Sequence, residues 1–104
     1  MAKWIQVGTE QEFTAGEKTC LTVENQQVCV MNIDGDLHAI VNICPHAGLP
    51  LGEGDLAEKV LTCPFHGFSF NVETGKNIDY EDDVPLMKLP VRTVDGKVEV
   101  DVES

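Results

Sequence analysis

Two short segments each place one cysteine close to one histidine. One residue separates Cys44 from His46, and two residues separate Cys63 from His66. Thiolate sulfur and imidazole nitrogen are common protein ligands of zinc and iron. Two Cys and two His would satisfy tetrahedral zinc, but a zinc finger pairs Cys with Cys and His with His over a helix. The pattern therefore predicts a metal site on these four residues and leaves zinc as an alternative.

Strand patterns dominate the elements that must position this site. Short or alternating apolar runs predict eight strands, over residues 4–7, 19–23, 28–33, 37–41, 60–62, 68–72, 87–94 and 98–102. One short helical turn is expected near Glu10 to Thr14. Three turns carry a glycine that can supply positive φ: Asp34-Gly35, Thr74-Gly75 and Asp95-Gly96. Eight short strands predict an all-β fold, an antiparallel barrel or sandwich.

The length of 104 residues suits a single domain, 1–104. Residues 43–55 and 63–67 fall between predicted strands and are rich in Pro and Gly, so the cysteines and histidines of the site lie on two loops. We expect these loops to form a small metal-binding subdomain at about residues 41–71. His38 lies inside a predicted strand with no cysteine nearby, and it is not counted as a ligand.

The other two cysteines, Cys20 and Cys29, have no neighbouring histidine. If Leu21 and Val23 face the core opposite Val30 and Val28, the two thiols lie diagonally across a strand pair, about 7 to 8 Å apart. That separation is beyond easy bridging, whereas a one-pair slip of register would bring the thiols face to face. We therefore predict free thiols with a structural role or none.

The formal net charge is −11, from 18 acidic and 7 basic side chains. This charge argues against binding nucleic acid or an anionic membrane surface, and it suits a basic protein partner. No apolar run approaches a membrane span, and the first residues lack the pattern of a signal peptide. A cytoplasmic protein is expected.

The C-x-H and C-x-x-H motifs, each followed by a glycine (Gly48 and Gly67), resemble those of the Rieske iron–sulfur proteins. The remainder looks like the ferredoxin component of ring-hydroxylating oxygenases. The resemblance implies a Rieske-type barrel and one [2Fe–2S] cluster, with Cys44 and Cys63 on one iron and His46 and His66 on the other. Pro85 resembles a proline segment that covers the cluster in this family.

Ligand charge predicts an electron-transfer centre of raised potential. Two ferric ions and two sulfides sum to +2, so two thiolates leave the oxidised cluster neutral and four would make it −2; Rieske centres span about −150 to +300 mV against about −400 mV for plant-type clusters. The respiratory proteins of the family have a disulfide between the cluster loops and two hydroxyls near the sulfurs. The matching positions here read Leu49 and Phe65, then Phe68 and Phe70. Fewer donors to sulfur predict a potential near the low end, about −150 mV.

The resemblance implies a one-electron carrier between a flavin-dependent reductase and a terminal oxygenase, with no catalysis and no small-molecule substrate of its own. A small Rieske subunit of a nitrite reductase complex is an alternative, as is a zinc-stabilised binding module without a redox role. The acidic run at Asp79 and 81–83 is expected to be either a solvated loop or part of a docking face.

Overall fold

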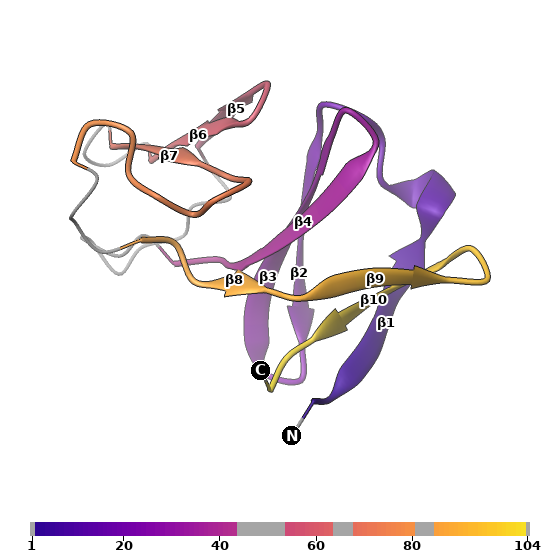
Figure 1. The fold of residues 1–104 in the computed structure, drawn as a ribbon. Coiled ribbons are helices and arrows are strands. Elements are labelled where there is room, and N and C mark those ends of the chain that lie inside the picture. Colours follow the sequence, from indigo (N-terminus) through magenta and orange to yellow (C-terminus); the bar gives the residue numbers. More distant parts are fainter. Residues whose placement is uncertain (1, 44–53, 64–67, 81–84, 104) are drawn as a thin grey trace.

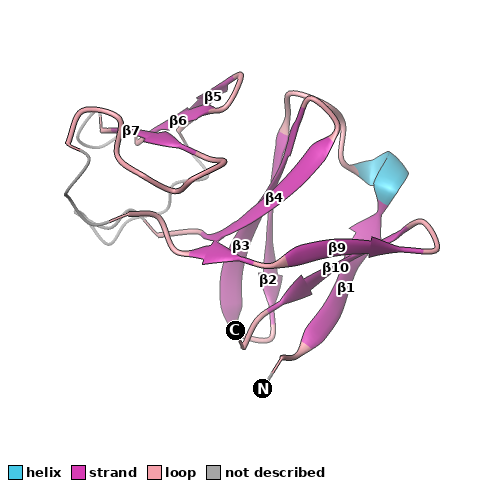
Figure 2. Cartoon of the chain, in the orientation of Figure 1, coloured by secondary structure: helices cyan, strands magenta, loops and turns pink. Residues whose placement is uncertain are grey.

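The computed structural model describes residues 2–43, 54–63, 68–80 and 85–103, and strands make up almost all of its regular structure (Figures 1 and 2). The strands are β1 (Trp4–Thr9), β2 (Lys18–Val23), β3 (Gln26–Ile33), β4 (Asp36–Val41), β5 (Asp55–Ala57), β6 (Val60–Thr62), β7 (Ser69–Asn71), β8 (Lys88–Leu89), β9 (Val91–Val94) and β10 (Lys97–Asp101). The short 3₁₀ helix η1 (Glu10–Glu12) falls within the predicted helical turn. In this part of the chain, no helix has the length and apolar character needed to cross a membrane. The all-β antiparallel prediction is confirmed.

A central antiparallel sheet in the order β2-β3-β4-β8 has apolar side chains buried on both of its faces. Successive side chains of a strand point to opposite faces, so β3 sends Val28 and Val30 into one core and Cys29 and Met31 into another. The first core packs against the sheet β1-β10-β9, which carries Val98 and Val100. The near-continuous apolar run of β3 follows from this double burial.

Pro90 divides the predicted strand 87–94 into β8 and β9. Proline lacks an amide hydrogen and cannot donate to a strand ladder. β8 pairs with β4 in the central sheet, whereas β9 pairs with β10 in the sheet that also contains β1. The Pro90 carbonyl accepts a hydrogen bond from the Asp101 amide (2.9 Å), which holds the crossing point in place. One continuous segment thus links the two sheets at Pro90 (Figure 1).

The third sheet is small, in the order β5-β6-β7, and carries the second core. Leu61, Phe70 and Val72 pack with Met31 and Ile40 of the central sheet. The sequence did not predict β5, because Leu56 is the only large apolar side chain in its three residues. This sheet lies within the predicted subdomain of residues 41–71, whose limits as a separate unit remain a prediction.

Turn geometry confirms the three predicted glycine turns. Gly35, Gly75 and Gly96 all have positive φ, at 95°, 82° and 76°. A fourth tight turn was missed because it contains no glycine: Glu24 and Asn25 have φ of 47° and 70°. Positive φ at both central residues is the signature of a two-residue type I′ hairpin turn.

This missed turn overturns the prediction that Cys20 and Cys29 are free thiols. A two-residue turn pairs Val23 with Gln26, so the ladder places Cys20 directly opposite Cys29. Their Cα atoms are 4.1 Å apart and the two residues form a disulfide. The error lay in the register, because the predicted pairing of Val23 with Val28 assumed a longer turn. One shift of the pairing converts a diagonal pair of cysteines into a facing one.

Candidate metal centre

The structure describes one of the four predicted ligands, Cys63. Cys44, His46 and His66 lie outside the described residues, as do Gly48 and Gly67. Their assignment as ligands therefore remains a prediction, and the described residues on either side show which elements lead to them. In the described ranges, no group of three or more His, Cys, Asp or Glu is arranged to hold a metal ion elsewhere.

Cys63 follows β6 directly and continues its pairing toward β7. Its amide donates a hydrogen bond to the Phe68 carbonyl (2.7 Å), which continues the pairing of Thr62 with Ser69 in the ladder of β6 and β7. Residues 64–67 lie between Cys63 and Phe68 in the sequence and include His66. The Cys63 thiol is free and has no solvent exposure.

The first loop begins at the central sheet and ends at the small one. At its start, the Asn42 amide donates to the Gln27 carbonyl (2.8 Å), and Ile43 immediately precedes Cys44. At its end, Asp55 opens β5 and pairs with Thr62, the residue before Cys63. The end of the loop that carries Cys44 and His46 therefore lies beside the start of the loop that carries Cys63 and His66.

A third segment begins at Pro85 and is hydrogen-bonded to Gly75 and to Val41 at the end of β4. The Leu86 amide donates to the Gly75 carbonyl (2.7 Å), and the Met87 carbonyl accepts from the Val41 amide (2.8 Å). Gly75 has positive φ, which strains any other residue, and a Cβ there would make a tight 3.3 Å contact with the Leu86 carbonyl oxygen. Pro85 is exposed at the start of this segment. Its predicted role as a cover remains a prediction.

Apolar side chains surround Cys63. Leu61, Phe70 and Leu86 are buried in the same core, and Phe68 packs against it. Phe68 meets Tyr80 edge to face, with ring centroids 6.2 Å apart, and the Asn77 side chain accepts the Tyr80 amide (3.1 Å).

A soft thiolate in a dry, apolar setting suits an iron–sulfur centre, since solvent access and dielectric help to set the potential of such a site. The Thr62 and Ser69 hydroxyls, on paired residues of β6 and β7, are hydrogen-bonded to each other (3.1 Å).

His38 has different surroundings. It faces Met31 across the ladder, and its Nδ1 lies 3.2 Å from the Lys88 ammonium, which also donates to the Glu73 carbonyl (2.6 Å). Burial first, and then the Lys88 charge, lowers the pKa of His38 below 6.5, while Glu73 and Asp36 oppose this shift. His38 is therefore held neutral as an acceptor.

Protonation of His38 should destabilise the fold. The pKa of His38 is lower in the folded chain than in the unfolded chain. As the pH falls through 6.5, the unfolded chain therefore binds more protons than the folded chain, and the contribution of neutral His38 to folding stability is lost. We expect the urea midpoint to fall less steeply for His38→Asn than for the wild type between about pH 8 and 5. Asparagine keeps an acceptor for Lys88 but does not titrate. Equal slopes in the two proteins would contradict this account.

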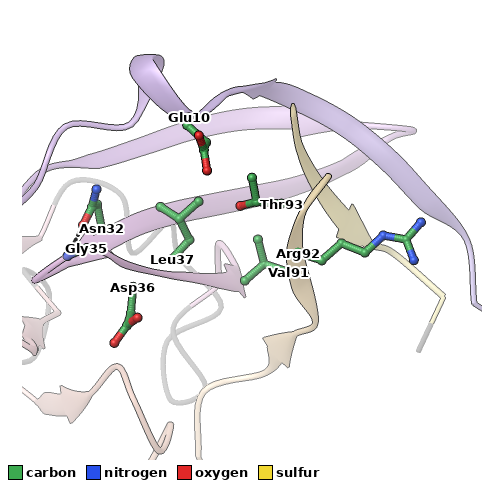
Figure 3. Close-up of a pocket in the computed structure, with 8 residues that line it drawn as sticks. All are labelled: Glu10, Asn32, Gly35, Asp36, Leu37, Val91, Arg92 and Thr93. Atoms are coloured by element: carbon green, nitrogen blue, oxygen red, sulfur yellow. Dashed lines mark hydrogen bonds between the residues drawn. The ribbon is translucent and has the colours of Figure 1, made fainter. Parts of the chain in front are cut away.

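A polar hollow of about 270 Å³ lies between the β3–β4 turn, η1 and β9 (Figure 3). Arg92 points away from Asn32 and Leu37 in this view, and its guanidinium bonds Glu99 (2.7 Å) and stacks 4.1 Å over the Trp4 ring. The Asn32 side chain donates a hydrogen bond to the Phe13 carbonyl and accepts one from the Gly35 amide, both at 2.8 Å. These polar groups serve the fold and do not converge on a ligand.

Residues 3–93 match the Rieske [2Fe–2S] domain family. The anthranilate 1,2-dioxygenase ferredoxin subunit of Burkholderia cepacia is 30% identical over 98% of this chain and 94% of its own. The ferredoxin component of the alkene monooxygenase system of Xanthobacter autotrophicus is 31% identical over 97% of this chain and 83% of its own. A chain in a solved complex of reduced oxygenase and oxidised ferredoxin, from carbazole 1,9a-dioxygenase, superimposes with a TM-score of 0.87 at 30% identity, covering 97% and 94% of the two chains.

Proposed function

The chain belongs to the Rieske [2Fe–2S] domain family, and on that premise we propose that Cys44, His46, Cys63 and His66 are the four ligands of one [2Fe–2S] cluster. The protein is an electron-transfer component of an oxygenase system and not its catalytic subunit. Its relatives are named as the ferredoxin subunit or ferredoxin component of such systems. The described residue that supports the ligand assignment is Cys63, a buried, unbridged thiol that follows Thr62, the partner of Asp55 in the β5–β6 ladder.

A bound cluster would supply a site that accepts and releases one electron. The protein sets the charge of the cluster through its ligands and limits the access of water to it. Thiolates from Cys44 and Cys63 would bring two negative charges, and the neutral imidazoles of His46 and His66 would bring none, which favours reduction relative to ligation by four thiolates. Leu61, Phe70 and Leu86 exclude water from the side of Cys63 that faces the core.

Partner proteins would exchange electrons with this end of the molecule. Exposed large apolar side chains in the described ranges include Ile43 (49%), Tyr80 (59%) and Met87 (66%). Ile43 precedes the first ligand loop, Met87 is bonded through its carbonyl to Val41, and Tyr80 contacts Phe68 beyond the second loop. Solvent-exposed apolar side chains near a redox site are typical of a transient protein interface.

We assign the two partners as a terminal oxygenase and a flavin-dependent ferredoxin reductase. The formal charge of −11 would favour partners with basic docking faces and would accelerate their association at low salt. A carrier of this kind binds no nucleic acid, membrane or small-molecule substrate, and we place it in the cytoplasm. Ferredoxins of a dioxygenase system and of a monooxygenase system are both similar to this chain, so an oxygenase of either kind fits the role of final partner.

An anaerobic preparation tests the assignment. We expect a coloured protein with iron and acid-labile sulfide in equal amounts, and a reduced-state electron paramagnetic resonance signal of mixed Cys and His ligation. A colourless protein with stoichiometric zinc would instead support the zinc module. A signal of cysteine-only ligation would contradict the roles of both histidines.

A further inference from the structure

The disulfide between Cys20 and Cys29 is not part of the cluster site, and its two sulfurs differ in access. Cys20 lies on the exposed side of β2, whereas Cys29 of β3 is fully buried. A hollow of about 120 Å³ adjoins Cys20 and is lined also by Leu21, Thr22, Gln27 and Asn42. Cys20 is therefore the exposed half of the disulfide, and we expect a small reagent to attack at Cys20 and not at the buried Cys29.

The facing pair is built by the ladder and does not depend on a loop. The tight turn at Glu24 and Asn25 fixes the register, and β3 is held on its other edge by β4. Reduced thiols at these two positions would stay opposite each other because the strands pair along their whole length. Bond formation in either direction then requires little movement of the backbone.

The cytoplasmic location proposed above would make the Cys20–Cys29 disulfide a redox switch. Cytoplasmic thiol systems keep most exposed cysteines reduced, so a disulfide with an accessible sulfur in a cytoplasmic carrier is expected to form and break with conditions. We propose that Cys20 and Cys29 are a reversible thiol–disulfide pair, oxidised by peroxides at Cys20 and reduced by dithiols at the same sulfur.

The oxidation proceeds in two balanced steps. The Cys20 thiolate attacks one peroxide oxygen, the O–O bond breaks, and the leaving hydroxide or alkoxide takes a proton; the product is a sulfenic acid on Cys20. The Cys29 thiol then attacks this sulfur, the S–O bond breaks, and water leaves as the disulfide forms. In the reverse direction, a dithiol thiolate attacks the sulfur of Cys20, Cys29 leaves as a thiol, and the second thiol of the reagent releases Cys20.

The crosslink should also strengthen the fold beneath the first ligand loop. β2 and β3 would be covalently joined, and Gln27 of β3 bonds Asn42, two residues before Cys44. A disulfide removes conformational freedom from the unfolded chain. We expect oxidation of the pair to lower the unfolding equilibrium constant roughly a hundredfold, within the usual range for such links.

Peptide mapping tests the proposal on the cluster-loaded protein. Protein reduced with dithiothreitol and desalted under argon is treated with diamide or hydrogen peroxide, denatured, alkylated with N-ethylmaleimide, and cut with a glutamate-specific protease. Cleavage after Glu24 separates Cys20, in peptide 18–24, from Cys29, in peptide 25–53. We expect peptide 18–24 to be alkylated in the reduced sample and linked to peptide 25–53 in the oxidised one.

Two variants identify the partner, because peptide 25–53 also contains Cys44. In Cys29→Ser the link should disappear, and Cys20 should form a mixed disulfide when oxidised glutathione is added to the reduced protein. In Cys20→Ser the buried Cys29 should resist alkylation in the native protein. A link that persists in Cys29→Ser, no link after oxidation, or a native disulfide that dithiothreitol does not reduce would each overturn the proposal. The visible spectrum, recorded alongside, reports the cluster independently.

Discussion

Cys63→Ala is expected to abolish the visible absorbance and the paramagnetic signal of the cluster while leaving a folded chain. Cys63 is the proposed ligand that the structure describes, and its buried thiol has no disulfide partner. A cluster with a missing thiolate keeps an open iron site, which a small methyl group in an apolar core cannot fill. The measurements are iron and sulfide content after anaerobic purification and the far-ultraviolet circular dichroism of the same sample.

Cys29→Ala provides a closely matched control. Cys29 and Cys63 both have 0% exposure and belong to the same apolar core, so each substitution removes one sulfur atom from the same surroundings. With both proteins kept under a thiol reductant, the loss of packing should be similar. We expect iron to be lost in Cys63→Ala alone. Equal loss in both variants would mean that the core, and not the thiolate, had been damaged, and it would contradict the assignment of Cys63.

The sequence predicted the family and the kind of cofactor better than it predicted the register of the strands. The ligand motifs are short, local patterns of residue types, and their chemistry does not depend on how distant strands pair. The family match over residues 3–93 supports the kind of cofactor, while all four ligands stay predictions. Cys63 directly follows β6, and its amide donates a hydrogen bond to the Phe68 carbonyl.

Register depended on a single turn that the residue types did not reveal. Glycine marked three turns correctly, but Glu24-Asn25 adopts the same left-handed conformation without glycine. Asparagine tolerates that conformation better than most residues, so Asn25 was the available signal. Strand β5 was harder still to predict from the sequence, because it carries one large apolar side chain and is held by its pairing with β6.

His66→Cys, in a protein that retains its cluster, is expected to lower the midpoint potential by about 125 mV. The wild type should lie near −150 mV, and four-cysteine clusters lie near −400 mV, so one of two ligand exchanges should account for roughly half of the difference. The added thiolate carries a negative charge that opposes reduction, and the loss of one imidazole should weaken the pH dependence of the potential at high pH. Spectroelectrochemical titration measures both.

The third histidine of the chain is the natural control for this shift. His38 is bonded to Lys88 on the central sheet, so His38→Asn should leave the potential unchanged although it alters the pH dependence of stability. We attribute the low predicted potential to Phe68 and Phe70, which provide no hydroxyl where the respiratory proteins of the family have them. A wild-type midpoint above about +100 mV would contradict that reason. A potential that rises in His66→Cys would contradict the ligand role of His66.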